Sequence, residues 1–168
     1  SVSSSGAVKV KTHQLNSNTK DIIRDNLLLF YVGGIRDANV LLKNDQLKMR
    51  EARDTSSSSY FDNIVDMGIA MTNALYEGDI DSYGELLHSY WMIKSERQKD
   101  STESVVHDVY ELGISNGALG GKLVGAGGSG FILFATRTPE RLRRAMLANK
   151  VKELDFDICN KGIQRISI

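Results

Sequence analysis

Glycine accounts for seven of the fourteen residues between Gly117 and Gly130. Because glycine has no side chain to block a ligand and tolerates positive φ, such a run lets several backbone N–H groups converge on one point. Convergent N–H groups favour an anion, most often a phosphate. The run therefore predicts a phosphate-binding loop, and the alternative is a tight, ligand-free connection between a helix and a strand.

Two familiar phosphate loops do not fit the surrounding sequence. Residues 125–130 contain the spacing G-x-G-x-x-G, but a dinucleotide-binding turn leads into a helix. Here the continuously apolar residues 131–135 follow, and they are typical of a buried strand. The pair Gly121-Lys122 is similar to the end of a P-loop, yet Asn116 and Leu123 stand where that loop needs glycine and a hydroxyl residue.

The glycine run instead resembles the third signature motif of the GHMP kinases, the family of galactokinase, homoserine kinase, mevalonate kinase and phosphomevalonate kinase. The usual form of that motif is G-A-K-[LM]-[ST]-G-A-G-x-G-G. The matching residues 120–130 depart from it at Gly121, Val124 and Ser129. The first two departures resemble the heptose-phosphate kinase branch. Since Val124 removes a hydroxyl that could face phosphate, backbone amides would have to contribute more here.

Three further segments resemble the same branch in the right order. Residues 8–15 are similar to its first strand, residues 27–34 to an apolar strand that ends in a small-residue turn, and residues 84–94 to its G-x-L-[LM]-x-x-x-W-x-x-K helix. The resemblance covers only the C-terminal half of such an enzyme. The ATP loop of the family, P-x-x-x-G-L-G-S-S-A, and its aspartate base are absent from the chain.

The resemblance implies that residues 1–168 are one GHMP kinase C-terminal domain, separated from its N-terminal ATP-loop domain. It further implies phosphoryl transfer from Mg-ATP to the anomeric hydroxyl of a sugar or sugar phosphate, with D-glycero-D-manno-heptose 7-phosphate favoured. ATP and Mg²⁺ would be held mostly by the N-terminal domain, so we expect no catalytic residue in this chain and no activity of the chain alone. A different class, a stand-alone, non-catalytic anion-binding or regulatory module, remains an alternative.

The residues expected to contact phosphate or substrate lie mainly in the glycine run: Gly121, Lys122, Gly125, Ala126, Gly127, Gly128, Ser129 and Gly130. A second group lies on the segment that resembles the sugar-side helix of the branch. There His88, Lys94 or Arg97 could contact the phosphate of a sugar phosphate, since ammonium and guanidinium groups pair strongly with phosphate oxygens. The alternative is a packed histidine and hydrated surface cations.

Other chemistries receive little support. His13, His107 and Cys159 lack the spacing of metal ligands, so we expect no metal site. Acidic and basic residues balance at 21 each, and the one arginine cluster, within 137–144, has no interleaved aromatic residues, which argues against nucleic acid. No apolar run approaches the length of a membrane span. The single cysteine favours a reducing, cytoplasmic compartment, and an interface left without its N-terminal domain would favour homo-oligomers.

Hydrophobic periodicity predicts the elements that position these residues. We expect strands at 8–10, 27–32, 131–135, 154–158 and 163–168, with the last two forming a hairpin. We expect helices within 35–42, 61–75, 80–93, 105–116 and 139–147, and a loop at 55–59. The pattern predicts an α+β sandwich, and the resemblance implies a ferredoxin-like antiparallel sheet with additional helices.

Helix ends give three more specific predictions. Asp79 and Thr138 should cap the starts of two helices through their side chains, with Pro139 at the first helical position. Gly117 should take the left-handed conformation at the end of the helix that precedes the glycine run.

Overall fold

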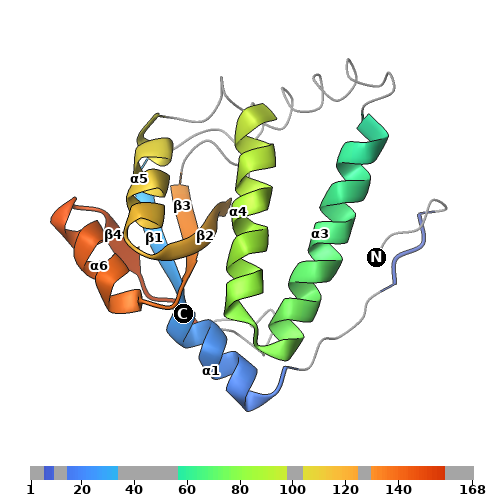
Figure 1. Ribbon diagram of the computed structural model, residues 1–168, viewed down its shortest axis with the longest axis horizontal. Coiled ribbons are helices and arrows are strands. Elements are labelled where there is room, and N and C mark those ends of the chain that lie inside the picture. The colour runs from blue at the N-terminus through green and yellow to red at the C-terminus, as the bar shows by residue number, and fades with distance from the viewer. Residues whose placement is uncertain (1–5, 10–14, 34–56, 98–103, 125–129, 158–168) are drawn as a thin grey trace, which may run out of the picture.

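The computed structural model describes residues 6–9, 15–33, 57–97, 104–124 and 130–157. In this part of the chain one antiparallel sheet has the strand order β2-β3-β1-β4. The strands are β1 (Leu27–Gly33), β2 (Ala118–Val124), β3 (Gly130–Thr136) and β4 (Lys152–Leu154). The helices are α1 (Ser17–Asn26), α3 (Ser57–Glu77), α4 (Ile80–Arg97), α5 (Ser104–Ser115) and α6 (Pro139–Ala148) (Figure 1).

The order of elements along the chain is that of a ferredoxin-like fold. Strand β1 is followed by helices, the β2–β3 pair, α6 and β4, which is a β-α-β-β-α-β succession with extra helices in its first crossover. Because β1 lies between β3 and β4 and is antiparallel to both, the strand order also agrees. The predicted α+β class and ferredoxin-like antiparallel sheet are confirmed.

Two apolar clusters form the core, one on each face of the sheet. On one face, α5 and α6 pack over Leu28, Phe30 and Val32 of β1 and over Ile132 and Phe134 of β3. On the other face, α1 and α4 cover Leu27 and Ala135, and α3 packs on α4 from outside. Figure 1 shows this arrangement, with α5 and α6 together and with α3 beside α4. The alternation along β1 and β3 therefore separates two helical layers.

Helix α4 packs closely on β2 because glycines occupy two positions of the contact, Gly84 and Gly120. A Cβ at Gly84 would lie 2.4 Å from the Cβ of Leu119, and a Cβ at Gly120 would lie 2.0 Å from the carbonyl oxygen of Gly84. The start of α4 is also joined to the end of β3, because Arg137 donates to both carboxylate oxygens of Asp81 at 2.9 and 2.8 Å. That hydrogen bonding keeps the pKa of Asp81 below its usual value.

Several helix ends agree with the sequence and one does not. Asp79 caps α4, since its Oδ1 accepts the N–H of Ser82 at 3.1 Å. Gly117 has φ 96° after α5, as expected, and Pro139 begins α6. The prediction for Thr138 was wrong, because its side chain makes no cap hydrogen bond. Its N–H instead donates to the hydroxyl of Thr136 at 3.0 Å.

Outside the glycine run, four expectations about the elements need correction. Helix α1 was not expected, because only Ile22 and Ile23 mark its apolar side. Its N-terminus is capped by a hydrogen bond of 2.8 Å from Thr19 N–H to Asn16 Oδ1, and hydrophobic periodicity does not indicate such a cap. Helix α3 already begins at Ser57, inside the predicted loop. Strand β4 ends at Leu154 instead of beginning there. Val8 is 71% exposed and makes only an isolated bridge, so it is not half-buried.

Some predictions fall outside the described residues: the helix within 35–42, the strand at 163–168 with its hairpin, and the residues His13, Ile158 and Cys159.

The turn after α6 contains a strained residue that gives a stability prediction. Lys150 has φ 60°, and its N–H donates to the carbonyl of Leu147 at 3.0 Å while the N–H of Val151 donates to that of Met146 at 2.9 Å. Glycine is favoured at this left-handed position, so Lys150→Gly should raise the free energy of unfolding by up to about 1 kcal/mol. Urea denaturation would measure it. The same change at Lys152, within β4, should destabilise, and a destabilised Lys150→Gly protein would contradict the account.

Candidate functional site

The residues on either side of positions 125–129, in the second half of the glycine run, belong to the sheet. Strand β2 ends at Val124 and β3 begins at Gly130, so residues 125–129 connect antiparallel neighbours. Gly130 pairs with Gly33, the last residue of β1, and these two have φ 107° and 83°. Side chains are disfavoured at such φ values. The connection thus leaves and re-enters the sheet at the end where β1 finishes. The predicted site residues Gly125, Ala126, Gly127, Gly128 and Ser129 lie outside the described residues.

The first half of the glycine run is a strand, which corrects the prediction of a loop from Gly117 onward. Gly121 lies within β2 and is buried. A Cβ there would lie 2.6 Å from Cδ1 of Phe134, so packing alone explains this glycine. Its N–H donates to the hydroxyl of Tyr110. A phosphate contact by Gly121 stays a prediction, and its amide would have to exchange partners to make it.

His88 belongs to a stack of aromatic rings between α4 and α5. Its Nδ1 lies 2.8 Å from the hydroxyl oxygen of Tyr110. The ring of Tyr110 is nearly parallel to that of His88, at 6.0 Å and 16°, and to that of Trp91, at 4.3 Å and 13°. Burial raises the pKa of Tyr110, so the phenol keeps its proton, which it can donate to His88. These contacts favour the packed-histidine alternative for His88.

Two of the predicted cations lie beside the ring of Tyr90. Lys122, on β2, places its Nζ 5.3 Å from the ring centroid of Tyr90, and Lys94, one helical turn after Tyr90 on α4, places its Nζ 6.0 Å from the same centroid. Tyr90 was not among the predicted site residues, although its i,i+4 spacing to Lys94 puts both on one side of the helix. The side chain of Arg97 is not among those described.

Comparison with known proteins gives the family. Residues 71–153 match the family model described as GHMP kinases C terminal. Residues 71–153 form a GHMP kinase C-terminal domain. This GHMP domain contains the last seven residues of α3, all of α4, α5 and α6, and strands β2 and β3, so it includes Tyr90, Lys94, Lys122 and the whole glycine run. The predicted family is confirmed.

Individual relatives of the GHMP domain support the same fold. The chain is 24% identical over 139 residues to D-glycero-alpha-D-manno-heptose 7-phosphate kinase of Campylobacter jejuni subsp. jejuni, covering 82% of this chain and 40% of that protein. The crystal structure of a D-glycero-D-manno-heptose 1-phosphate kinase from Bacteroides thetaiotaomicron is similar with a TM-score of 0.62 and 18% identity, over 91% of this chain and 39% of that one.

The L. major mevalonate kinase bound to R-mevalonate has a TM-score of 0.65 and 20% identity, over 76% of this chain and 40% of that one. The chain thus spans about 40% of the length of the curated relative that it matches.

One cavity lies at the end of the sheet where residues 125–129 connect β2 to β3. Its volume is about 550 Å³, and it is lined by α5, the end of β1 and the turn after α6. Its wall is mainly apolar, with three polar side chains: Asp108, Asn149 and Lys150. It lies on the α5 side of β1, whereas Lys122 faces α4, so the cavity and the two lysines are on opposite faces of the sheet.

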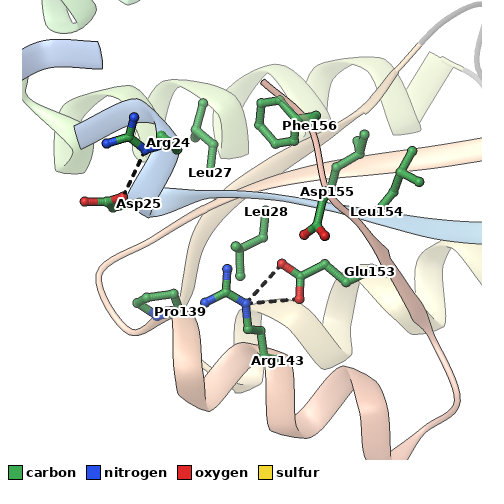
Figure 2. A pocket seen from close by; sticks show the side chains of 11 residues that line it. Arg24, Asp25, Leu27, Leu28, Pro139, Arg143, Glu153, Leu154, Asp155 and Phe156 are labelled. Atoms are coloured by element: carbon green, nitrogen blue, oxygen red, sulfur yellow. Dashed lines mark hydrogen bonds and ion pairs between the residues drawn. The ribbon is translucent and has the colours of Figure 1, made fainter. Parts of the chain in front are cut away.

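A second cavity, of about 410 Å³, lies at the other end of β1 (Figure 2). Figure 2 shows that its two arginines are joined to carboxylates of the same wall. Arg143 Nε donates to both carboxylate oxygens of Glu153 at 3.0 Å. Arg24 Nε lies 3.7 Å from Oδ1 of Asp25. Because these charges are neutralised within the wall, this cavity is a poor candidate for binding an anion.

Two further properties of the described residues concern cofactors and membranes. Among them, no three His, Cys, Asp or Glu side chains come together as ligands for a metal ion. None of their helices combines the length and apolar character that a membrane span requires.

Proposed function

We propose that this chain is the C-terminal domain of an ATP-dependent GHMP kinase, a phosphotransferase that acts on the anomeric hydroxyl of a sugar or sugar phosphate. The favoured acceptor is D-glycero-D-manno-heptose 7-phosphate. The observation that carries the proposal is that a GHMP domain has a glycine run with Lys122 inside it, and that the second half of this run, from Gly125, connects β2 to β3 at one end of the sheet. The similarity to a heptose 7-phosphate kinase supports the choice of acceptor.

The chain would contribute charge and position to the reaction. Phosphoryl transfer depends mainly on neutralising the phosphoryl oxygens and aligning the acceptor. The residues fit phosphate in two respects. Lys122 provides an ammonium group three residues before Gly125, and the small residues 125–130 leave backbone N–H groups accessible to a phosphate. ATP would supply the phosphoryl group, and Mg²⁺ would neutralise its charge, with ligands mostly from the N-terminal domain.

The proposal includes an N-terminal domain as the main partner and a cytoplasmic location. Two apolar residues near the glycine run are partly exposed: Val124 at 44% and Tyr31 at 41%. An apolar surface of this kind would be covered by a partner in the whole enzyme and would favour homo-oligomers of this chain alone.

A phosphoryl-transfer assay tests the proposal. The native polypeptide that contains this chain would be incubated with Mg-ATP and either heptose 7-phosphate or a neutral sugar, and ADP and sugar phosphates would be measured. We expect turnover with at least one sugar acceptor, and none by residues 1–168 alone. Phosphate binding without turnover on any acceptor would favour the non-catalytic anion-binding module instead.

A further inference from the structure

Helix α3 carries apolar side chains on a side that α4 does not cover. Among its described side chains only Ala74 is buried, because α3 packs mainly on α4, and Figure 1 shows it as the outer helix of that pair. Val65 is 60% exposed, Ile69 56% and Tyr76 37%. Spacings of four and seven residues place these three on one line along the helix, the α3 stripe, which is about 16 Å long. A helix that is apolar on two sides is expected to be covered on both.

The α3 stripe is bordered by negative charge. The charged residues of α3 are all acidic, namely Asp62, Asp66 and Glu77, and all three are exposed. Their spacing places them on a second line along the helix, next to the stripe. A surface with carboxylates in the same places would be repelled by this border, and one with ammonium or guanidinium groups would be attracted to it.

A groove of about 490 Å³ extends the acidic border toward α4. Glu77 lines it from α3, Asp79 from the connection between the two helices and Glu85 from α4, and the described residues of its wall include no lysine or arginine. The N–H and the hydroxyl of Ser82 donate to the carboxylate of Asp79 at 3.1 and 2.6 Å, which lowers the pKa of Asp79 and keeps it charged. A groove of this kind suits lysine and arginine side chains, which pair with carboxylates.

A second copy of this chain suits the α3 stripe poorly. In a two-fold dimer the same patch of each copy meets the other. In an antiparallel pair of α3 helices the acidic border of one helix would lie against the acidic border of its partner, and like charges at the flanks of paired helices are destabilising.

From the apolar stripe, its acidic border and the acidic groove we infer that α3 docks a basic amphipathic helix of a separate partner protein. Apolar residues of the partner helix would pack on Val65, Ile69 and Tyr76. Its lysines and arginines would lie over Asp62 and Asp66 and extend into the groove. Apolar contact along a line with opposite charges at the flanks is the common way in which two helices pair. The inference goes beyond the proposed function, since it uses none of the residues assigned to phosphate or substrate.

Two synthetic peptides test the α3 surface. Both form helices of about five turns with leucine at three- and four-residue spacings, and they differ only in carrying either lysine or glutamate at the flanking positions. Their binding to residues 1–168 would be measured by isothermal titration calorimetry at physiological salt. We expect the lysine peptide to bind at least about tenfold more tightly than the glutamate peptide.

Variants locate the binding on α3. Ile69→Asp places a charge within the stripe and should weaken binding of the lysine peptide at least about tenfold. Replacing the acidic border by Asp62→Lys, Asp66→Lys and Glu77→Lys together should reverse the preference, so that the glutamate peptide binds more tightly. Leu147→Asp is the matched control, because Leu147 is 77% exposed on α6, over the other face of the sheet, and its replacement should leave binding unchanged. Circular dichroism would check the fold of each variant.

Equal binding of the two peptides would overturn the inference, and so would undiminished binding of the lysine peptide by the Ile69→Asp protein. A dimer of residues 1–168 that Ile69→Asp dissociates, as seen by sedimentation, would overturn it as well, because the stripe would then belong to a second copy. The native polypeptide that contains this chain should bind the lysine peptide as tightly as residues 1–168 do. If it did not bind, the rest of that polypeptide would cover α3, and no separate partner would dock there.

Discussion

Replacing Gly120 by alanine is expected to lower the free energy of unfolding by about 3 kcal/mol. The added Cβ would lie 2.0 Å from the carbonyl oxygen of Gly84 and 2.6 Å from the backbone N of His88. Both are main-chain atoms of α4, so no side-chain rotation can relieve the overlap. Helix α4 would have to move away from β2, which would also loosen the stack of His88, Tyr110 and Trp91. Urea denaturation followed by circular dichroism would measure the loss.

Gly68 provides the matched control for this prediction. It lies within α3, and a Cβ there would meet nothing within 4 Å. Because alanine is the better helix former, Gly68→Ala should leave stability unchanged or raise it by up to about 1 kcal/mol. If Gly120→Ala were as stable as Gly68→Ala, the direct contact between α4 and β2 would be wrong. In that case the phosphate-binding loop, and not the packing of β2 on α4, would explain why position 120 is a glycine.

The strands that the sequence predicted well are the ones with buried side chains on both faces. Residues 27–32 and 131–135 are continuous apolar runs, and both lie in the middle of the sheet as β1 and β3. Strand β2 was missed, since glycine weakens the strand signal and Gly120 and Gly121 occupy its centre. Its hydrogen bonds to β3 and its contact with α4 outweigh that local preference. Tertiary contacts of this kind produce no hydrophobic periodicity in the sequence, so the sequence alone does not predict the strand.

The same limit applies to the site. The sequence identified Lys94 and Lys122 as candidates separately, through charge and through resemblance to a family motif. It did not predict that Tyr90 lies beside both, because the contact joins β2 to α4 across 32 residues of chain. The partner of His88, Tyr110, lies 22 residues away on another helix. A helix carrying a histidine, an aromatic residue and a lysine can present any of them to a ligand, and only the packing of α5 shows that His88 faces inward.

Replacing Gly127 by valine is expected to reduce the kcat/KM of the native polypeptide at least a thousandfold. Gly127 itself lies outside the described residues, but its place between Val124 and Gly130 limits it to five connecting residues at the end of the sheet. A branched side chain there would obstruct the approach of a phosphate to the backbone N–H groups. Losing one such donor in a preorganised site typically costs a hundredfold to a thousandfold, and an obstructed approach removes several at once.

Gly68→Val is the control, since it makes the same substitution where a Cβ meets no neighbour. Steady-state assays with Mg-ATP and heptose 7-phosphate should give this control near wild-type turnover, while Gly127→Val loses it and keeps its circular dichroism spectrum. Turnover retained by Gly127→Val would remove the glycine run from the mechanism. The run would then be a structural connection between β2 and β3, and the catalytic charge would have to come from Lys122 and the N-terminal domain alone. A lower kcat with an unchanged KM would instead indicate amides that act only on the transferred phosphoryl group.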